Sequence, residues 1–360
     1  MLDFRSLLRR EIRQINVYNG AMTQSANLSH KGVIFSGMRP TGLLHLGNYM
    51  GALQNWVNLQ EDYSCIYCAV DIHALTTLES GEEVKEIKPN IEDMILDWLA
   101  AGIDPEKSIV FVQSHVPEVM TLHTLLSMVT PLGWLTRVPT FKDKVRQMRE
   151  TEETVNYGLV GYPVLQTADI ILYKADTIPV GQDQVPHIEL SREIVRRFNN
   201  MFGETFPEPQ AKLTEAPLIL GLDGQHKMSK TMDNHLELAA TPEETTKRVL
   251  TAFTDPQRLR RDDPGRPEVC NIYSLHKIFS GAEATSTVYN ECTTATRGCV
   301  DCKRHLADSI NDYLKDLRER REDIKARHGY VQEILHEGGK KARAIAKETI
   351  AEVYDKMGLG

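Results

Sequence analysis

Two short segments of the sequence carry residues of the kind that hold phosphate groups. The first is a glycine-containing turn, Ser36–Gly42, which leads into the run HLGN at 45–48 and the expected start of a helix. Glycines let the backbone approach a ligand, and the free N–H groups at a helix start face an anion. His45 could donate a hydrogen bond to an oxygen that gains charge. Alone this pattern is weak, because such turns also exist only to reverse the chain.

The second segment is the loop Lys227–Thr231, with the sequence KMSKT. Two lysines three residues apart, beside hydroxyl groups, suit a triphosphate, because mobile point charges can follow a leaving pyrophosphate. A solvated basic loop is the usual alternative meaning of Lys-x-x-Lys. The occurrence of both segments in this order favours a shared nucleotide site.

Four of the six cysteines lie close together in the last third of the sequence, namely Cys270, Cys292, Cys299 and Cys302. Four thiolates with a closing Cys-x-x-Cys suit a soft metal centre, either zinc or an iron–sulfur cluster, and spacing alone does not separate the two. Four scattered buried cysteines are the alternative. Cys65 and Cys68 fall in an expected strand, where an offset of three points them to opposite faces, so we expect them in the core.

The elements that must position these residues alternate between strands and helices from residue 32 onward. Apolar runs predict buried strands at 33–35, 65–70, 108–113, 178–180 and 218–222, and helices at about 47–61 and from Pro89. This alternation predicts an α/β fold, a Rossmann-like doubly wound parallel sheet with helices on both sides. After about Thr241 only helical patterns follow, which predicts a C-terminal all-helical domain.

The predicted organisation has four parts. Residues 1–30 form an N-terminal extension, interpreted as a frayed extension rather than a targeting peptide because Asp3 and Glu11 count against targeting. Residues 31–240 form the Rossmann-like domain with the KMSKT loop, and 241–335 a helical domain with the cysteines. Residues 336–360 form a helix that packs back on the first domain.

Composition limits the possible classes of protein. The 360 residues are 41% hydrophobic and 26% charged, typical of a globular chain, and the net charge of −8 excludes a surface that is basic throughout. No segment approaches the roughly 20 apolar residues of a membrane span. Six cysteines are too few for a disulfide scaffold, so we expect a reducing, cytoplasmic location without membrane association.

The turn with its HLGN run (36–48) and the KMSKT loop (227–231) are together called the two phosphate segments. They resemble the signatures of class I aminoacyl-tRNA synthetases, since HLGN matches HIGH and KMSKT matches KMSKS. The resemblance extends from about Gly32 to the C-terminus. It is strongest to the tryptophanyl-tRNA synthetase family, through VIFSGMRPTG, VDIHALT, YPVLQTADIILY and IPVGQDQVPHIELSREIVRRFN. A tyrosine-specific relative, a catalytically silent tRNA-binding paralogue and a nucleotidyltransferase acting on a small acid are the alternative functions.

The resemblance implies that L-tryptophan is activated with ATP and Mg²⁺ and is then transferred to tRNA(Trp) by a homodimer. The implied catalytic residues, which hold the phosphates as charge builds, are His45, Asn48, Lys227 and Lys230. The implied ATP-binding residues are Arg39, Pro40, Thr41, Gly47, Asn48, Gly181, Gln182, Asp183, Leu218, Lys227, Met228, Ser229, Lys230 and Thr231. Arg39, Gln182 and Thr231 replace residues that are more common in the family.

The resemblance also implies a tryptophan pocket in which Asp169 accepts a hydrogen bond from the indole N–H. A site built around such a buried acceptor rejects phenylalanine strongly. An N-cap or a buried ion pair is the alternative role for this aspartate. The other implied pocket residues are Phe35, Tyr162, Gln184, His73, Ile178 and Val180, and Gln166 departs from the usual methionine.

Some members of the family show a similar cysteine spacing and carry a 4Fe–4S cluster. The resemblance therefore implies a 4Fe–4S cluster on Cys270, Cys292, Cys299 and Cys302, with zinc as the alternative. In this family the helical domain meets the tRNA anticodon, which implies that the metal centre shapes a binding surface and does not carry electrons.

Overall fold

The computed structural model describes residues 30–77, 80–138, 141, 142, 145, 155–214 and 219–359. Contacts divide the chain into the units Met1–Lys31 and Gly32–Gly360, and the second unit is described below. The predicted N-terminal extension and Leu218 lie outside the described residues. None of the described helices is both long and apolar enough to cross a membrane.

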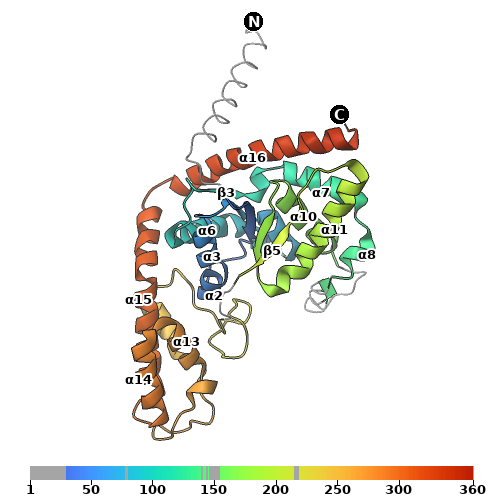
Figure 1. The fold of residues 1–360 in the computed structure, drawn as a ribbon. Helices are drawn as coiled ribbons and strands as arrows, with labels where there is room; N and C mark the ends of the chain where they lie inside the picture. Colours follow the sequence, from blue (N-terminus) through green and yellow to red (C-terminus); the bar gives the residue numbers. More distant parts are fainter. Residues whose placement is uncertain are drawn as a thin grey trace. The chain divides into compact units, whose positions relative to one another are not determined.

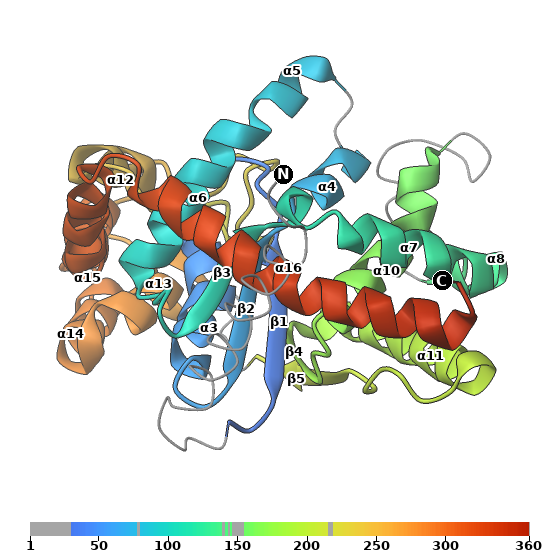
Figure 2. The same cartoon turned by 90° about the horizontal axis from the view of Figure 1, so that it is seen from above.

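The second unit is built on a parallel sheet (Figure 2). Within the described residues it has five strands in the order β3-β2-β1-β4-β5. Their bounds are Val33–Met38 (β1), Ser64–Ala69 (β2), Ser108–Val112 (β3), Thr177–Val180 (β4) and Gln210–Leu213 (β5). The strand order reverses between β1 and β4, which is where doubly wound sheets open a crevice at the carboxyl ends of the strands. The predicted Rossmann-like fold is confirmed.

One predicted strand is wrong and one strand was missed. Residues 219–222 form no strand and make only an isolated bridge between Leu220 and Lys227. The fifth strand is instead β5, at the edge of the sheet, where most side chains are exposed. Its sequence, QAKL, has no apolar run, because an edge strand that faces solvent needs none.

Helices cover both faces of the sheet (Figure 1). Those of the first part are α2 (Leu46–Asn48), α3 (Gln54–Leu59), α4 (Asp71–Ala74), α5 (Gly81–Lys85), α6 (Ile87–Ala101), α7 (Glu118–Val129), α8 (Leu132–Leu135), α10 (Tyr157–Ile171) and α11 (Val185–Phe202), with a π-helical segment η1 (Tyr49–Leu53). Short 3₁₀ segments are η2 (Leu75–Thr77), η3 (Gln113–His115) and η4 (Gln182–Gln184).

Two hydrophobic cores lie on the two faces of the sheet. One contains Trp56 of α3 and Trp98 of α6, and the other contains Leu122 of α7 and Val164 of α10. Successive residues of β2 alternate between them, so that Cys65 lies in the first core and Cys68 in the second. The prediction that these two cysteines are core residues on opposite faces is confirmed.

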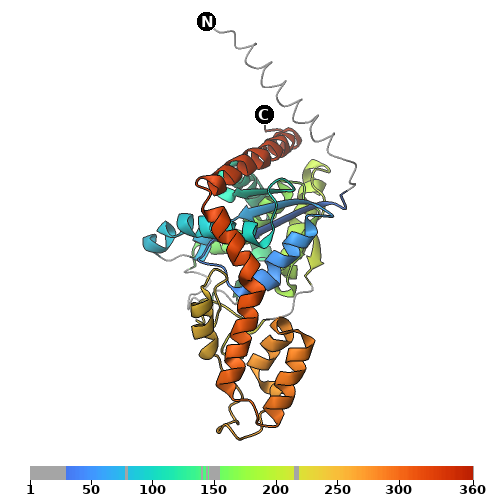
Figure 3. The same ribbon diagram turned by 90° about the vertical axis from the view of Figure 1, so that its left-hand side faces the viewer.

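The described C-terminal part contains helices joined by irregular segments and has no strand (Figure 3). It consists of α12 (Pro242–Leu250), η5 (Pro267–Val269), α13 (Asn271–Phe279), α14 (Gly281–Thr293), α15 (Cys299–Lys325) and α16 (Tyr330–Met357). A buried ion pair ties α15 to α6: Arg321, 5% exposed, donates to Asp97, 1% exposed, over 2.7 Å. Burial raises the pKa of Asp97 to about 6, although the Arg321 guanidinium lowers it.

The last helix, α16, crosses over strand β3 (Figure 2). Its first half contributes Ile334 and Leu335 to one core, and its second half contributes Ala346 and Val353 to the other. The crossing point is Gly338, where a Cβ atom would lie 1.8 Å from the carbonyl oxygen of Val110. A glycine is therefore required for the helix to approach the strand backbone.

We expect Gly338→Ala to destabilise the protein by about 3 kcal/mol or more, because the helix must move off the strand and both cores must adjust. Chemical denaturation measures this loss. Gly339→Ala is the matched control, since its Cβ would lie 3.4 Å from its nearest neighbour, an ordinary contact. Equal effects of the two substitutions would contradict this account of the crossing.

Candidate nucleotide and amino-acid site

The two phosphate segments lie side by side in the structure. The chain that follows the KMSKT loop pairs with the chain around His45: Leu46 N–H donates to Leu236 O over 2.8 Å, and Leu238 N–H donates to Leu44 O over 2.9 Å. A Cβ atom on Gly42 would lie 2.6 Å from Lys230 Nζ. The glycine turn after β1 and the second lysine of KMSKT therefore meet at one place.

Met228 and Gly47 extend this contact. A Cβ atom on Gly47 would lie 3.2 Å from Met228 Cβ, and Met228 is buried. The buried Met228 side chain therefore packs the KMSKT loop against the start of α2. Ser229 and Thr231 flank Lys230, so hydroxyl groups and the ammonium group share this region.

His45 is 8% exposed and sits among positive groups. Burial, followed by the charges of His235, Lys230 and Lys227, lowers the pKa of His45 to about 4. The imidazole is therefore neutral at pH 7, and its buried Nδ1 has no hydrogen-bond partner among the described residues. Such an atom is suited to a ligand, because a buried polar group without a partner is costly.

Asn48 and Lys230 have defined surroundings. The Asn48 side-chain oxygen accepts from the backbone N–H of His45 over 3.1 Å, which fixes the histidine at the helix start and leaves the amide nitrogen as the group that could donate to a phosphate. Burial lowers the pKa of Lys230, while Glu237 and Asp97 raise it. A partly desolvated ammonium interacts more strongly with an anion than one in water.

Asn234 holds the KMSKT loop in shape. Its side-chain oxygen accepts from Ser229 N–H over 2.7 Å, and its amide nitrogen donates to Asp223 Oδ2 over 3.0 Å and to Lys227 O over 3.3 Å. A Cβ atom on Gly221 would lie 2.1 Å from this amide. Asn234 was not predicted from the sequence, because its burial and its contacts with the loop are visible only in the structure.

A cavity of about 590 Å³ opens beside these segments, at the carboxyl ends of β1 and β4. It is lined by all seven predicted pocket residues, namely Phe35, His73, Tyr162, Asp169, Ile178, Val180 and Gln184. Three predicted ATP-binding residues also line it, namely Arg39, Gly181 and Asp183, and so does Gln166. The structure thus brings these predicted residues together around one cavity, and their roles remain predictions.

The other predicted ATP-binding residues that the structure describes do not line the cavity. Pro40 and Thr41 form a tight turn after Arg39, with Thr41 N–H donating to Arg39 O over 2.9 Å. Arg39 Nη1 donates to Thr77 Oγ1 over 3.1 Å, and burial lowers the pKa of Arg39. Gln182 lies in η4 between Gly181 and Asp183.

Asp169 is a buried acceptor in the middle of helix α10. His73 Nε2 lies 2.9 Å from Asp169 Oδ2. The side-chain nitrogen of Gln113 donates to Asp169 Oδ1 over 2.9 Å and to Oδ2 over 2.8 Å. Its mid-helix place excludes an N-cap role, and its partners include no lysine or arginine among the described residues. The sequence analysis missed Gln113, because a single glutamine after an apolar strand carries no distinctive pattern.

Apolar groups and hydrogen bonds complete the pocket wall. The Phe35 ring stacks on Tyr173 with centroids 5.6 Å apart, which fixes the ring at the end of the cavity. The Tyr162 hydroxyl lies 3.3 Å from His187 Nε2, and Gln184 Nε2 donates to Asp183 Oδ2 over 2.8 Å. The pocket thus has an apolar body and polar groups at defined points, as ligand sites generally do.

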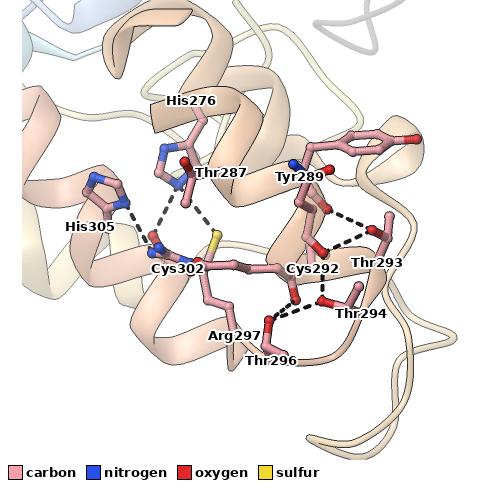
Figure 4. Close-up of polar contacts among 12 residues, drawn as sticks. His276, Thr287, Tyr289, Cys292, Thr293, Thr294, Thr296, Arg297, Cys302 and His305 are labelled. Atoms are coloured by element: carbon pink, nitrogen blue, oxygen red, sulfur yellow. Dashed lines mark hydrogen bonds and ion pairs between the residues drawn. The ribbon is translucent and has the colours of Figure 1, made fainter. Parts of the chain in front are cut away.

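The four clustered cysteines lie in the C-terminal helices and are all free thiols. Cys302 Sγ lies 3.4 Å from His276 Nε2 (Figure 4), and Arg258 Nη1 donates to Cys292 Sγ over 3.7 Å. Burial, followed by Cys270 and partly offset by Arg297, raises the pKa of Cys302 to about 12. In the described part of the chain, no three side chains of His, Cys, Asp or Glu come together as ligands of one metal ion. The predicted metal site is not confirmed.

Comparison with known proteins agrees with this geometry. Residues 27–315 match the family of class I tRNA synthetases for tryptophan and tyrosine (W and Y). The tryptophan–tRNA ligase of Deinococcus radiodurans is 46% identical over 329 residues, which cover 91% of this chain and 98% of that protein. That of Thermotoga maritima is 45% identical over 328 residues, which cover 91% and 99%.

A solved structure is similar over the same region. The tryptophanyl-tRNA synthetase of Campylobacter jejuni, solved with ADP and tryptophan, is 34% identical with a TM-score of 0.82, and the match covers 91% of this chain and all of that one. A parallel sheet that reverses its strand order beside a joined pair of phosphate segments defines a nucleotide-dependent enzyme of the Rossmann-like kind. The chain belongs to the class I tRNA synthetases of the tryptophan and tyrosine family.

The lowered pKa of His45 predicts a pH dependence of stability. Between pH 6.5 and about 4 the unfolded chain binds a proton at this histidine that the folded chain does not, so the free energy of unfolding falls as the pH is lowered through this window. The His45→Gln variant lacks this titrating group, so its free energy of unfolding should fall less over the same pH window. Denaturation at several pH values measures the slope, and identical slopes for the two proteins would contradict the burial of a neutral imidazole.

Proposed function

We propose that this chain is a tryptophan–tRNA ligase, which activates L-tryptophan with ATP to tryptophanyl-adenylate and then transfers the amino acid to tRNA(Trp). The observation that carries the proposal is the cavity that runs from the glycine-containing turn after β1, through Arg39, to the buried carboxylate of Asp169, while Lys230 of the KMSKT loop meets the same turn at Gly42. The names of the relatives from Deinococcus radiodurans and Thermotoga maritima support it. So do the ADP and tryptophan in the similar structure from Campylobacter jejuni.

The chemistry of activation needs positioning and charge stabilisation rather than a general base. The tryptophan carboxylate is already ionised at pH 7 and attacks the α-phosphorus of ATP, which enters as its Mg²⁺ complex, and pyrophosphate leaves. Lys227 and Lys230 hold the phosphates as negative charge moves to the leaving group. The neutral His45 imidazole and the Asn48 amide add hydrogen bonds without adding a mobile proton.

The other residues orient the two substrates. Asp183, with Gly181 and Gln182, accepts from the ATP ribose hydroxyls at the carboxyl end of β4, and Arg39 faces the phosphates from the end of β1. The remaining nucleotide contacts come from the backbone and side chains of the two phosphate segments, including Pro40, Thr41, Gly47, Met228, Ser229 and Thr231.

Asp169 accepts from the indole N–H, while Phe35, Ile178 and Val180 contact the ring. Tyr162 and Gln184 contact the amino and carboxylate groups, and His73 closes the pocket beside Asp169. A tyrosine-specific enzyme is the second candidate, because a phenol hydroxyl is also a donor. The amino-acid panel below separates the two.

We expect Asp169→Ala to weaken tryptophan activation by about 10- to 150-fold, the effect of losing a hydrogen bond to a charged acceptor. The KM for ATP should change far less, since Asp169 lies away from the phosphate segments. ATP–pyrophosphate exchange with tryptophan, tyrosine and phenylalanine measures both parameters. Equal losses for ATP and tryptophan would make Asp169 a structural residue, and faster exchange with tyrosine in the wild type would favour the second candidate.

The C-terminal helices supply the tRNA-binding surface in this proposal, and the enzyme acts in the cytoplasm as a homodimer. α15 presents the cation Arg304, whose side chain is 62% exposed, directly after the cysteines. Its neighbour Lys303 is occupied, because its ammonium group donates to Leu250 O over 3.0 Å. Arg304 forms an ion pair with Asp301 over 3.8 Å, but both of these side chains are exposed, so Arg304 is still the more accessible of the two cations for a phosphate.

We further propose that the four clustered cysteines hold a 4Fe–4S cluster, which would supply thiolate–iron bonds that join α13, α14 and α15. Support comes from the proximity of the thiols, since, after burial, the other three cysteines all help to raise the pKa of Cys302, as negatively charged neighbours do. Gly265 leaves room beside them: a Cβ atom there would lie 2.4 Å from Cys292 Sγ. Arg258 adds a positive charge that suits a thiolate-rich site.

Anaerobically purified protein should be brown, with absorbance near roughly 400 nm from thiolate-ligated iron. Cys299→Ser should lose the iron, whereas Cys65→Ser, in the core, should keep it. Iron and zinc analysis together with the absorbance spectrum measures the result. Colourless protein with stoichiometric zinc would replace the iron assignment by the zinc alternative.

A further inference from the structure

Gln113 directly follows β3 and donates a hydrogen bond to Asp169, which lines the amino-acid pocket. It is 1% exposed and does not line the cavity, so it cannot touch a ligand there. We propose that Gln113 is a positioning residue, which sets the Asp169 carboxylate in the orientation that recognises an indole N–H. This assignment rests on the proposed function and adds a specificity-determining residue to it.

Both ends of the Gln113 amide are fixed. The amide nitrogen donates to Asp169 Oδ1 over 2.9 Å and to Oδ2 over 2.8 Å, so it faces both carboxylate oxygens. The amide oxygen accepts from the backbone N–H groups of Ile72 and His73 over 3.1 and 3.2 Å. A flipped amide would place oxygen against oxygen, so the hydrogen-bond network allows only one orientation.

The same glutamine also positions the second donor to Asp169. By accepting from the first turn of α4, it fixes the backbone of His73, whose Nε2 lies 2.9 Å from Asp169 Oδ2. An ionised carboxylate offers about four acceptor positions, and these contacts occupy three of them. One position remains for a donor in the cavity that Asp169 lines.

The chemistry of the glutamine suits this task. Its amide is a neutral donor, so it holds the carboxylate without neutralising the charge that strengthens the bond to an indole N–H. Loss of the amide would leave Asp169 able to rotate about its own side-chain torsions. It would also leave the N–H groups of Ile72 and His73 without this acceptor. A single substitution therefore removes one donor to Asp169, the Gln113 amide, and disturbs the position of the other, the His73 imidazole.

The test compares tryptophan with an analogue in which sulfur replaces the indole N–H, 3-benzothienylalanine, in ATP–pyrophosphate exchange. Gln113→Met should raise the KM for tryptophan by about 10- to 100-fold and leave the KM for ATP nearly unchanged. The loss for the sulfur analogue should be several-fold smaller, because no N–H is there to be recognised. In an Asp169→Ala background, Gln113→Met should cause little further loss.

Two further variants keep the test decisive. Gln113→Glu retains the acceptor for Ile72 and His73 but places a carboxylate against Asp169, so it should fold and still lose tryptophan selectively. Gln60→Met is the matched control: Gln60 is a buried glutamine that bridges Gly102 O and Asp104 N–H far from the cavity. It should lower stability without changing the preference for tryptophan over the analogue.

Equal losses for tryptophan and the analogue in both Gln113 variants, or no loss in either, would overturn the positioning role while leaving the proposed function intact. A wild-type protein that activates neither tryptophan nor the analogue would overturn the proposed function and this assignment with it. These two failures are distinguishable, because the second is already visible before any substitution is made.

Discussion

The reversal of strand order between β1 and β4 is the constraint on which the other features of the site depend. The chain leaves these two neighbouring strands in different directions, so their carboxyl ends cannot be covered by one helix. The turn after β1 provides one side of the opening, and the Gly181–Gln184 segment after β4 provides the other. The KMSKT loop then closes on the turn through backbone pairing at 44–46 and 236–238.

The site has opposite electrostatic character at its two ends. At one end, Lys227, Lys230 and the turn before α2 present ammonium and N–H groups, and His45 stays neutral because it is buried and, to a lesser extent, because positive charges surround it. At the other end, the Asp169 carboxylate is a hydrogen-bond acceptor whose partners are the His73 imidazole and the neutral Gln113 amide. A molecule with a phosphate at one end and an N–H donor at the other can bind in only one direction.

The sequence was sufficient to predict the fold class because its buried strands are unbroken apolar runs that alternate with helical patterns, as is typical of a parallel sheet covered on both faces. It failed at β5 because an exposed edge strand has no such run, and at 219–222 because apolar residues in a loop can pack without pairing. All the pocket candidates gathered around one cavity, since motif residues are constrained by a ligand. Gln113 and Asn234 escaped notice because each acts through a neighbour, and that relation exists only in three dimensions.

The four cysteines show the same limit. Their spacing predicts a metal centre, but within the described residues no three His, Cys, Asp or Glu side chains come together as ligands of one ion, because spacing along the chain does not fix how the thiols lie in three dimensions. The role of Gly265 could not be predicted from the sequence, because it depends on a residue distant in the chain: a Cβ atom at Gly265 would lie 2.4 Å from Cys292 Sγ.

The position of α16 has a consequence for how the polypeptide matures. This helix is synthesised after all five strands, yet it supplies side chains to both cores and covers strand β3 at the border of the sheet. Until it emerges, β3 presents an open row of backbone donors and acceptors to any other nascent chain. The synthesis of α16 and the protection of β3 from misassociation are therefore coupled in this protein, because the helix must dock on the strand at Gly338.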